Sequence, residues 1–125
     1  MIDIGSQSDF TEGAVTVTQV GKQEIGVICW GGTLYAVRNV CPHQSGPVCS
    51  GQLLPLLTAP QAGTARLTRD PSRPVLSCPW HAWEFDLRTG RALWNERYRL
   101  RMYPIEVRDG RVLVDTKRHA QPRVG

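Results

Sequence analysis

The sequence predicts an all-β fold, an antiparallel sandwich or barrel of short strands. Several short runs alternate apolar and polar residues with a period of two, which is the pattern of half-buried strands. Turns that contain glycine separate many of these runs, as in sandwiches and barrels. With 125 residues, of which 41% are hydrophobic, the chain suits a single domain with a modest core.

Three consecutive strands are predicted in the first part of the chain. Residues 14–20 alternate valine and threonine, and residues 25–30 form a second, more apolar strand that follows at once. Gly31-Gly32 is a permissive hairpin turn, after which residues 34–38 return as the third strand. This strand leads directly to Cys41, so we expect Cys41 to lie on a loop beyond a strand end.

Shorter strands are predicted in the second part of the chain. Pro104 implies an edge strand or a bend, because proline has no N–H to give to a ladder. Asp109-Gly110 is the strongest turn signal in the sequence. The predicted strands of this part cover residues 83–87, 91–94, 100–103, 105–107 and 112–114.

Two short motifs carry the chemistry: Cys41-Pro42-His43 and Cys78-Pro79-Trp80-His81. Each offers one thiolate and one imidazole. Two such pairs suit a 2Fe-2S cluster in which two cysteines hold one iron and two histidines hold the other. The oxidised centre would then be neutral, so it accepts an electron more easily than a four-cysteine site does. The motifs therefore predict single-electron transfer.

Zinc is the alternative metal, because two cysteines and two histidines also form a zinc site. Zinc fingers pair cysteine with cysteine and histidine with histidine, whereas this chain alternates the two residue types. The order favours iron, and analysis for iron and acid-labile sulfide distinguishes the two metals. The remaining cysteines are not expected to be ligands: Cys29 is interpreted as a buried apolar residue and Cys49 as structural or a free thiol.

Residues 41–48 and 78–90 resemble the two cluster-binding boxes of Rieske-type proteins. The residues before the first box, 34–40, are also similar to that family, so the resemblance covers most of the chain. The ligands that the resemblance implies are Cys41 and Cys78 on the inner iron and His43 and His81 on the outer iron of a Rieske-type 2Fe-2S cluster.

The resemblance also implies a Rieske-like antiparallel β-sandwich with a small cluster-binding subdomain. The domain would cover residues 1–116, followed by a flexible basic tail over residues 117–125. The proline-rich segment 50–74 would be a long insertion between the two boxes, without structure of its own. We favour a tolerated surface insertion; the alternative is that Leu53-Leu54 and Leu56-Leu57 pack near the cluster.

The second box points to a low reduction potential. Trp80, Trp83 and Phe85 stand where respiratory-type Rieske proteins have a disulfide cysteine, a serine and a tyrosine, the last two donating hydrogen bonds to the cluster sulfurs. Without these donors the reduced cluster is less stabilised, which predicts a potential toward the lower end of about −150 to +300 mV. Trp80 and Trp83 are expected to shield the cluster from water, and Trp94 is expected in the core.

A soluble carrier of low potential is what oxygenase systems use. By resemblance, the protein would be a ferredoxin that takes single electrons from a flavin-dependent reductase and passes them to a terminal oxygenase. The alternative is the small Rieske-like subunit of an assimilatory nitrite reductase, against which the full ligand set speaks. No catalytic residue is predicted, because the chain would be a non-catalytic component of an oxidoreductase system.

Composition argues against other classes of partner. The net charge of +4 is due in part to the basic tail, so nucleic-acid binding is not expected. No apolar run is long enough to cross a bilayer, and the first residues lack the features of a secretory signal. Four cysteines in such a chain indicate metal or redox chemistry. We therefore expect a cytoplasmic protein without a membrane partner.

Overall fold

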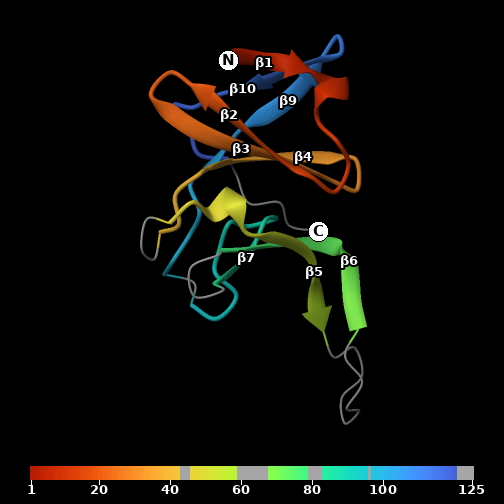
Figure 1. Cartoon of the computed structure of the whole chain (residues 1–125), viewed down its shortest axis with the longest axis vertical. Helices are drawn as coiled ribbons and strands as arrows, with labels where there is room; N and C mark the ends of the chain where they lie inside the picture. The colour runs from red at the N-terminus through yellow and green to blue at the C-terminus, as the bar shows by residue number, and fades with distance from the viewer. Residues whose placement is uncertain (43–45, 59–67, 79–82, 96, 121–125) are drawn as a thin grey trace.

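The computed structural model describes residues 1–42, 46–58, 68–78, 83–95 and 97–120. Within these ranges the chain forms three antiparallel β-sheets, stacked one below the next in Figure 1. The described helical segments are two single turns of 3-10 helix, η1 (Gln7–Asp9) and η2 (Val48–Ser50). The predicted all-β fold class is therefore confirmed. No helix among the described residues has the length and apolar character needed to cross a membrane.

The first sheet has the strand order β1 (Ile2–Ser6), β10 (Arg111–Val114) and β9 (Ile105–Arg108). Strand β1 was not among the predicted strands. Its register against β10 shifts between Asp3 and Gly5, and Gly5 has a φ of 141°, which side chains rarely adopt. The shift interrupts the period-two pattern that would have revealed the strand.

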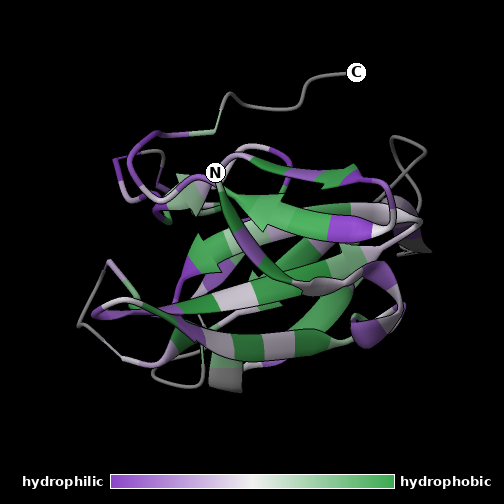
Figure 2. Cartoon of the chain, turned by 90° about the horizontal axis from the view of Figure 1, so that it is seen from above, coloured by the Kyte–Doolittle hydropathy of each residue, from purple (hydrophilic) through white to green (hydrophobic). Residues whose placement is uncertain are grey.

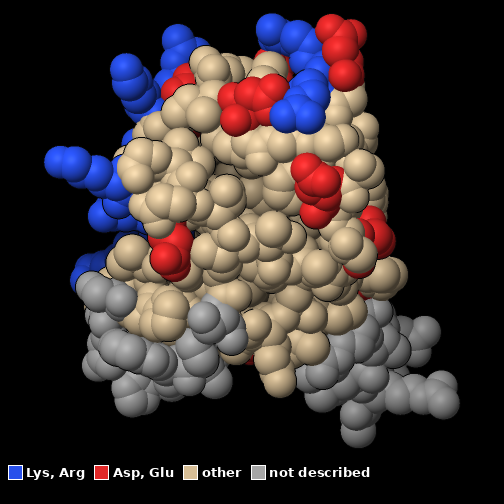
Figure 3. All heavy atoms as spheres, turned by 45° about the horizontal axis from the view of Figure 1, so that its top comes forward, with Lys and Arg blue, Asp and Glu red and all other residues tan. Residues whose placement is uncertain are grey.

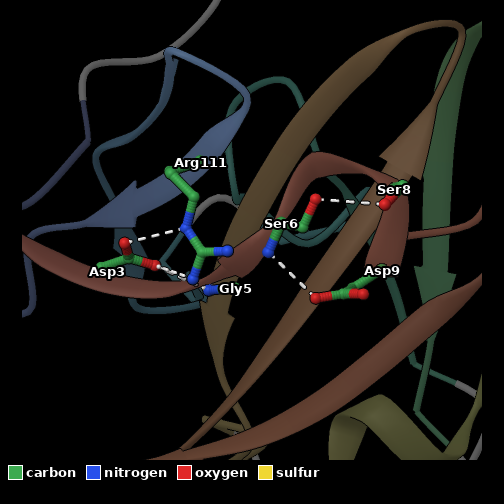
Figure 4. Close-up of polar contacts among 6 residues, drawn as sticks. All are labelled: Asp3, Gly5, Ser6, Ser8, Asp9 and Arg111. Carbon is green, nitrogen blue, oxygen red and sulfur yellow. Dashed lines mark hydrogen bonds and ion pairs between the residues drawn. The ribbon is translucent and has the colours of Figure 1, made fainter.

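A bidentate ion pair fixes β1 to β10 at this shift. The Nε and Nη2 atoms of Arg111 each lie 3.0 Å from a carboxylate oxygen of Asp3, as Figure 4 shows. The Arg111 hydrogen bond, followed by that of the Gly5 N–H, holds the pKa of Asp3 below its usual value. Both side chains are exposed, so the pair aligns the strand more than it stabilises it.

The middle sheet has the order β2 (Val15–Val20), β3 (Gln23–Trp30), β4 (Thr33–Arg38) and β8 (Met102–Tyr103). The three strands predicted at residues 14–20, 25–30 and 34–38 are confirmed, with bounds that differ by one or two residues. The hairpin turn at Gly31-Gly32 is also confirmed, since both residues have positive φ. The Glu12 carboxylate accepts the N–H groups of both glycines, at 2.8 and 3.0 Å.

The central parts of β3 and β4 are buried on both faces of the middle sheet, and their period-two alternation divides their side chains between two cores. On β3, Ile25 and Val27 face the core shared with the first sheet, whereas Ile28 faces the core shared with the third. On β4, Ala36 and Val37 divide in the same way. Figure 2 shows that hydrophobic residues are frequent along the strands. The third sheet therefore packs against an apolar face of the middle sheet.

The third sheet has the order β5 (Gln52–Thr58), β6 (Thr68–Ser77) and β7 (Glu84–Asp86). The expectation that residues 50–74 lack structure of their own is wrong, because most of the described part of this segment belongs to the paired strands β5 and β6. The two strands pair regularly until Pro55 faces Pro74, and the register then shifts so that Leu56 faces Asp70. Proline has no N–H for the ladder, so a register shift is favoured at this point.

Two side-chain contacts link the residues of β6 that the register shift leaves unpaired to the rest of the molecule. The Trp30 Nε1–H donates to the Pro71 carbonyl at 2.6 Å, which links the middle sheet to β6. The Arg73 Nη2 atom lies 3.0 Å from the Asp86 carboxylate, which is buried at the end of β7. The β5–β6 hairpin is thus anchored at its base.

The division of the chain into a domain over residues 1–116 and a tail over residues 117–125 remains a prediction. Of the proposed tail, residues 117–120 are described. The Ala120 N–H donates to the Met102 carbonyl at 3.1 Å, and Ala120 packs against the core beneath the third sheet.

Candidate metal centre

The first predicted ligand, Cys41, lies just beyond the end of β4, as expected. The Cys41 N–H donates to the carbonyl of Gly46 at 2.7 Å. This main-chain hydrogen bond joins residues five apart and closes a short loop. Val48, directly after the loop, is fully buried and begins η2. The loop is therefore held at both ends by the fold.

The second predicted ligand, Cys78, directly follows the end of β6 and opens a loop of the same kind. The Cys78 N–H donates to the carbonyl of Trp83 at 2.7 Å, again across five residues. Strand β7 begins at Glu84, so this loop is also bounded by strands on both sides. Two segments far apart in the sequence thus place a cysteine N–H in the same kind of hydrogen bond, to a carbonyl five residues later.

The two cysteines belong to a single cluster of packed, buried side chains. Cys41 and Cys78 are each only 1% exposed. The structure has all four cysteines of the chain as thiols rather than disulfides. Thiol groups withdrawn from water at the entrances of two matched loops suit the soft iron of a sulfide-bridged centre.

His43 and His81, the two histidines of the predicted ligand set, lie outside the described residues, as does Trp80. Among the residues that are described, no group of three or more His, Cys, Asp or Glu side chains is arranged to hold a metal ion. The assignment of the four ligands therefore remains a prediction. The described half of the donor set, two buried thiols in one cluster, fits the iron-sulfur chemistry that the sequence predicts.

Cys49 has a structural role in the described fold. Its side chain is buried in the core between the middle and third sheets, against Gly26 of β3. Burial, assisted by the negative charge of Glu24, raises the pKa of the Cys49 thiol to about 12. A thiol with so high a pKa is a poor metal ligand and a poor nucleophile near neutral pH.

Asn39 is a positioning residue that sequence reasoning missed. Its Oδ1 atom accepts the N–H of Cys49 at 2.8 Å, and its Nδ2 atom donates to Glu24 Oε1 at 2.6 Å. Its own N–H donates to the Glu24 carbonyl at 2.9 Å. Asn39 thus joins the chain before the first loop to the chain after it and fixes both to β3. The only signal in the sequence is a polar residue between a strand and Cys41.

An aromatic cluster lies beside the second loop. The Trp83 ring meets the Trp94 ring edge to face at 4.5 Å between centroids, and the Tyr98 ring in the same way at 4.8 Å. Phe85 lies further away, at 6.4 Å. Trp83 is half-buried, in keeping with the predicted cover of this loop. The expected core position of Trp94 is wrong: its side chain is 63% exposed.

The strand predicted over residues 91–94 is also reduced to single bridges. Ala92 pairs with Phe85, and Arg91 pairs with Arg99. The Leu93 N–H still donates to the Glu84 carbonyl of β7 at 3.0 Å, and Trp94 lies beyond this last bond, which is why the alternating pattern does not bury it. Leu53 packs against the cluster of buried side chains that contains the two cysteines. The alternative hypothesis, that the insertion leucines lie near the iron-sulfur cluster, remains a prediction.

Comparison with known proteins gives a family match and a related protein sequence. The family model described as "Rieske [2Fe-2S] domain" matches residues 1–104. The "Alkene monooxygenase system, ferredoxin component" of Xanthobacter autotrophicus is 28% identical over 116 residues, covering 93% of this chain and 81% of that protein.

Two solved structures share the fold. A "Complex of reduced oxygenase and oxidized ferredoxin in carbazole 1,9a-dioxygenase" has a chain that matches with a TM-score of 0.66 and 23% identity, covering 91% of this chain and all of that one. A "putative NADH-dependent nitrite reductase small subunit" of Mycobacterium tuberculosis matches with a TM-score of 0.69 and 18% identity, covering 90% and 91%. Both types of protein considered above are therefore built on this fold.

Proposed function

The chain belongs to the Rieske [2Fe-2S] domain family, and on that premise we propose that it is the electron-transfer component of an oxygenase system. Its cofactor is a Rieske-type 2Fe-2S cluster, which supplies a reversible one-electron step when bound. The observation that carries the proposal is the pair of matched loops, each opened by a buried cysteine and closed five residues later. The ferredoxin named above is related over most of its length and serves a monooxygenase.

We assign the four predicted residues as the ligands of the cluster. Cys41 and Cys78 would hold one iron, because both thiols are withdrawn from water within one packed cluster. His43 and His81 would hold the other iron, because each lies a few residues after a cysteine in the same short loop. Neutral imidazole ligands stabilise the ferrous state, so the electron would be stored on the histidine side.

The described residues contribute to electron transfer by keeping the loops fixed and dry. The closing hydrogen bonds at Gly46 and Trp83 hold the main chain of each loop against the strands that flank it. Asn39 fixes the first loop to β3, and Trp83 covers the second. Little has to move when the charge of the centre changes by one, so the reorganisation energy stays low.

The partners in this proposal are a flavin-dependent reductase on the donor side and a terminal oxygenase on the acceptor side. The carbazole dioxygenase complex supports the second partner, since its title pairs an oxygenase with a ferredoxin. We also propose a cytoplasmic location. All four cysteines are thiols, which is the usual state in a reducing compartment.

The small subunit of a nitrite reductase is the alternative function. The fold does not discriminate, since the TM-scores of the two structures differ by only 0.03, from 0.66 to 0.69. The ferredoxin assignment is favoured because the named sequence relative is an oxygenase ferredoxin, and because the chain retains all four predicted ligands. Stable co-purification with a sirohaem subunit would support the alternative instead.

Electron delivery in a reconstituted system tests the function. The reconstituted holoprotein should be reduced by NAD(P)H through a flavin reductase and should support substrate turnover by a terminal oxygenase from the same organism. Omission of the protein should abolish coupled turnover. Reduction without any turnover, with every oxygenase of that organism, would contradict the proposed acceptor.

Point variants test the ligand assignment. Replacing His43 or His81 by alanine should abolish the visible and EPR spectra of the Rieske cluster and lower the content of iron and acid-labile sulfide. Cys49→Ala is the matched control, because it removes a buried cysteine that is not assigned as a ligand, and it should retain a full cluster. One zinc per chain in place of iron and sulfide would overturn the assignment.

A further inference from the structure

The chain after Ala92 carries apolar and basic residues close together in the sequence. The Ala92 N–H donates to the Tyr98 carbonyl at 2.9 Å, and the Tyr98 N–H donates to the Asn95 carbonyl at 3.1 Å, so the chain turns back between Ala92 and Tyr98. Arg91 and Arg99 pair at the base of this turn. We use the name Trp94 patch for Arg91, Leu93, Trp94, Arg97 and Arg99.

The apolar part of the patch consists of two exposed side chains that are adjacent in the sequence, not of isolated exposed residues. Leu93 is 40% exposed and Trp94 is 63% exposed, and they are neighbours in the chain. The other exposed large apolar side chains among the described residues belong to β1, β2, β9 and the N-terminus. Tryptophan is costly to leave in water and is enriched in the centres of protein interfaces. Adjacent exposed leucine and tryptophan therefore indicate a contact surface.

The rim of the patch is positively charged. Arg97 and Arg99 are exposed, and Arg91 is half-buried. Within the described part of the chain, none of the three forms an ion pair, although four such pairs are found elsewhere. Figure 3 shows basic side chains along one edge of the molecule and others beside acidic side chains at its top. Unpaired arginines attract an acidic surface.

The patch is joined to the metal centre by direct contacts. Trp94 touches Trp83 edge to face at 4.5 Å between centroids. The Trp83 carbonyl in turn accepts the N–H of Cys78, one of the assigned iron ligands. A protein that covers Trp94 therefore comes within two residue contacts of a ligand cysteine. A surface so close to the centre suits an electron-transfer partner better than a structural one.

We propose that the Trp94 patch docks an acidic surface with an apolar centre on the oxygenase partner. This inference rests on the proposed function and deepens it, since it names the surface and the chemistry of the partner's face. The indole of Trp94 would fill the apolar centre, and the three arginines would face carboxylates around it. The charges would accelerate the encounter, and the indole would slow dissociation.

Steady-state turnover with the oxygenase tests the patch. Trp94→Ala should raise the KM for the holoprotein at least about tenfold, as for an interface tryptophan, and should leave kcat unchanged. The double variant Arg97→Glu/Arg99→Glu should raise KM most at low ionic strength, and the difference from wild type should shrink as salt is added. The reduction potential and the EPR spectrum should stay as in wild type in both variants.

A matched control lies at the far end of the molecule. Val107 is 41% exposed on β9 and is followed by the exposed Arg108, so Val107→Ala/Arg108→Glu removes the same kinds of group from the opposite sheet. This variant should retain the wild-type KM. Trp94→Phe, which keeps an aromatic ring, should fall between wild type and Trp94→Ala if the alanine variant acts through docking and not through misfolding.

The outcomes separate the patch from the proposed function. If wild type supports turnover and both patch variants keep its KM, the proposed docking role of the Trp94 patch is wrong and the proposed function stands. If wild type supports no oxygenase, the proposed function fails. The charge of the patch is then tested by the rates at which two small oxidants oxidise the reduced protein. The charge reversal should then slow oxidation of the reduced protein by ferricyanide and accelerate oxidation by hexaammineruthenium(III). Unchanged rates with both oxidants would overturn the patch.

Discussion

Gly26 of β3 provides the space that the Cys49 side chain fills. A Cβ atom built on Gly26 would lie 2.1 Å from the Cys49 Sγ atom and 3.2 Å from its Cβ atom. Real side chains do not approach so closely, so the absence of a side chain at residue 26 is what lets η2 settle on the middle sheet. The position of the loop that follows Cys41 thus depends on a contact between two residues that are not assigned as ligands.

Gly26→Ala should therefore destabilise the protein by about 1–3 kcal/mol, as expected for overpacking of a core. Chemical denaturation of the holoprotein measures this loss, and the iron content after dialysis reports on the loop. The double variant Gly26→Ala/Cys49→Ala removes the sulfur that clashes and should recover part of the stability. If the second substitution adds a further loss instead, the proposed contact does not cause the effect.

The Cys49 thiol should make stability fall at alkaline pH. Its pKa rises from 9.0 to about 12 on folding, so the neutral thiol is favoured in the folded state. The resulting stability is present below pH 9 and is lost as the pH rises from 9 toward 12, because the unfolded chain releases its proton first. Urea denaturation over this range should show a shallower decline for Cys49→Ala than for wild type. Equal declines would contradict a buried neutral thiol.

Asn39→Ala should cost about 1–3 kcal/mol, since it leaves the buried N–H of Cys49 without its acceptor. Asn39→Asp retains that acceptor but places a second carboxylate beside Glu24. The aspartate variant should consequently be less impaired at pH 5 than at pH 7, because a shared proton relieves the repulsion. Denaturation curves at both pH values check this. Gln19→Ala removes only an exposed hydrogen bond and should change little.

The reduction potential should lie toward the lower end of about −150 to +300 mV, because Phe85 has no hydroxyl group to donate to the cluster. Phe85→Tyr should then raise the potential in an anaerobic redox titration. Phe85→Leu adds no donor and should not raise it. Phe85 is fully buried, so the cluster content of both variants must be measured beside the potential.

The sequence predicted the middle sheet well because its strands carry clear alternation and end at glycine turns. Strand β1 was missed because the shift at Gly5 breaks a five-residue pattern. Strands β5 and β6 were missed because prolines interrupt them, and single-sequence reasoning does not reveal that Pro55 and Pro74 face each other. Both errors arise where pairing depends on a partner strand.

The sequence predicted the chemistry of the site but not the residues that hold its loops in place. Cys41 is found on a loop beyond a strand end, as predicted, whereas Cys78 follows β6, a strand that was not predicted. The roles of Gly26 and Asn39 depend on contacts with a residue in another segment, which no local pattern encodes. Trp94 was misplaced for a related reason: its hydrophobicity suggested burial, whereas it lies one residue beyond the last hydrogen bond to β7.

The two hydrogen bonds that close the loops after Cys41 and Cys78 use main-chain atoms alone. Any residue other than proline at positions 41 and 78 can donate such a bond, and any residue at positions 46 and 83 can accept it. Amino-acid replacements between these anchor points therefore leave both closures in place. With His43 and His81 kept as the assigned ligands, the remaining positions inside the two loops are suitable for a randomised library in which the colour and redox behaviour of the protein are selected without rebuilding its scaffold.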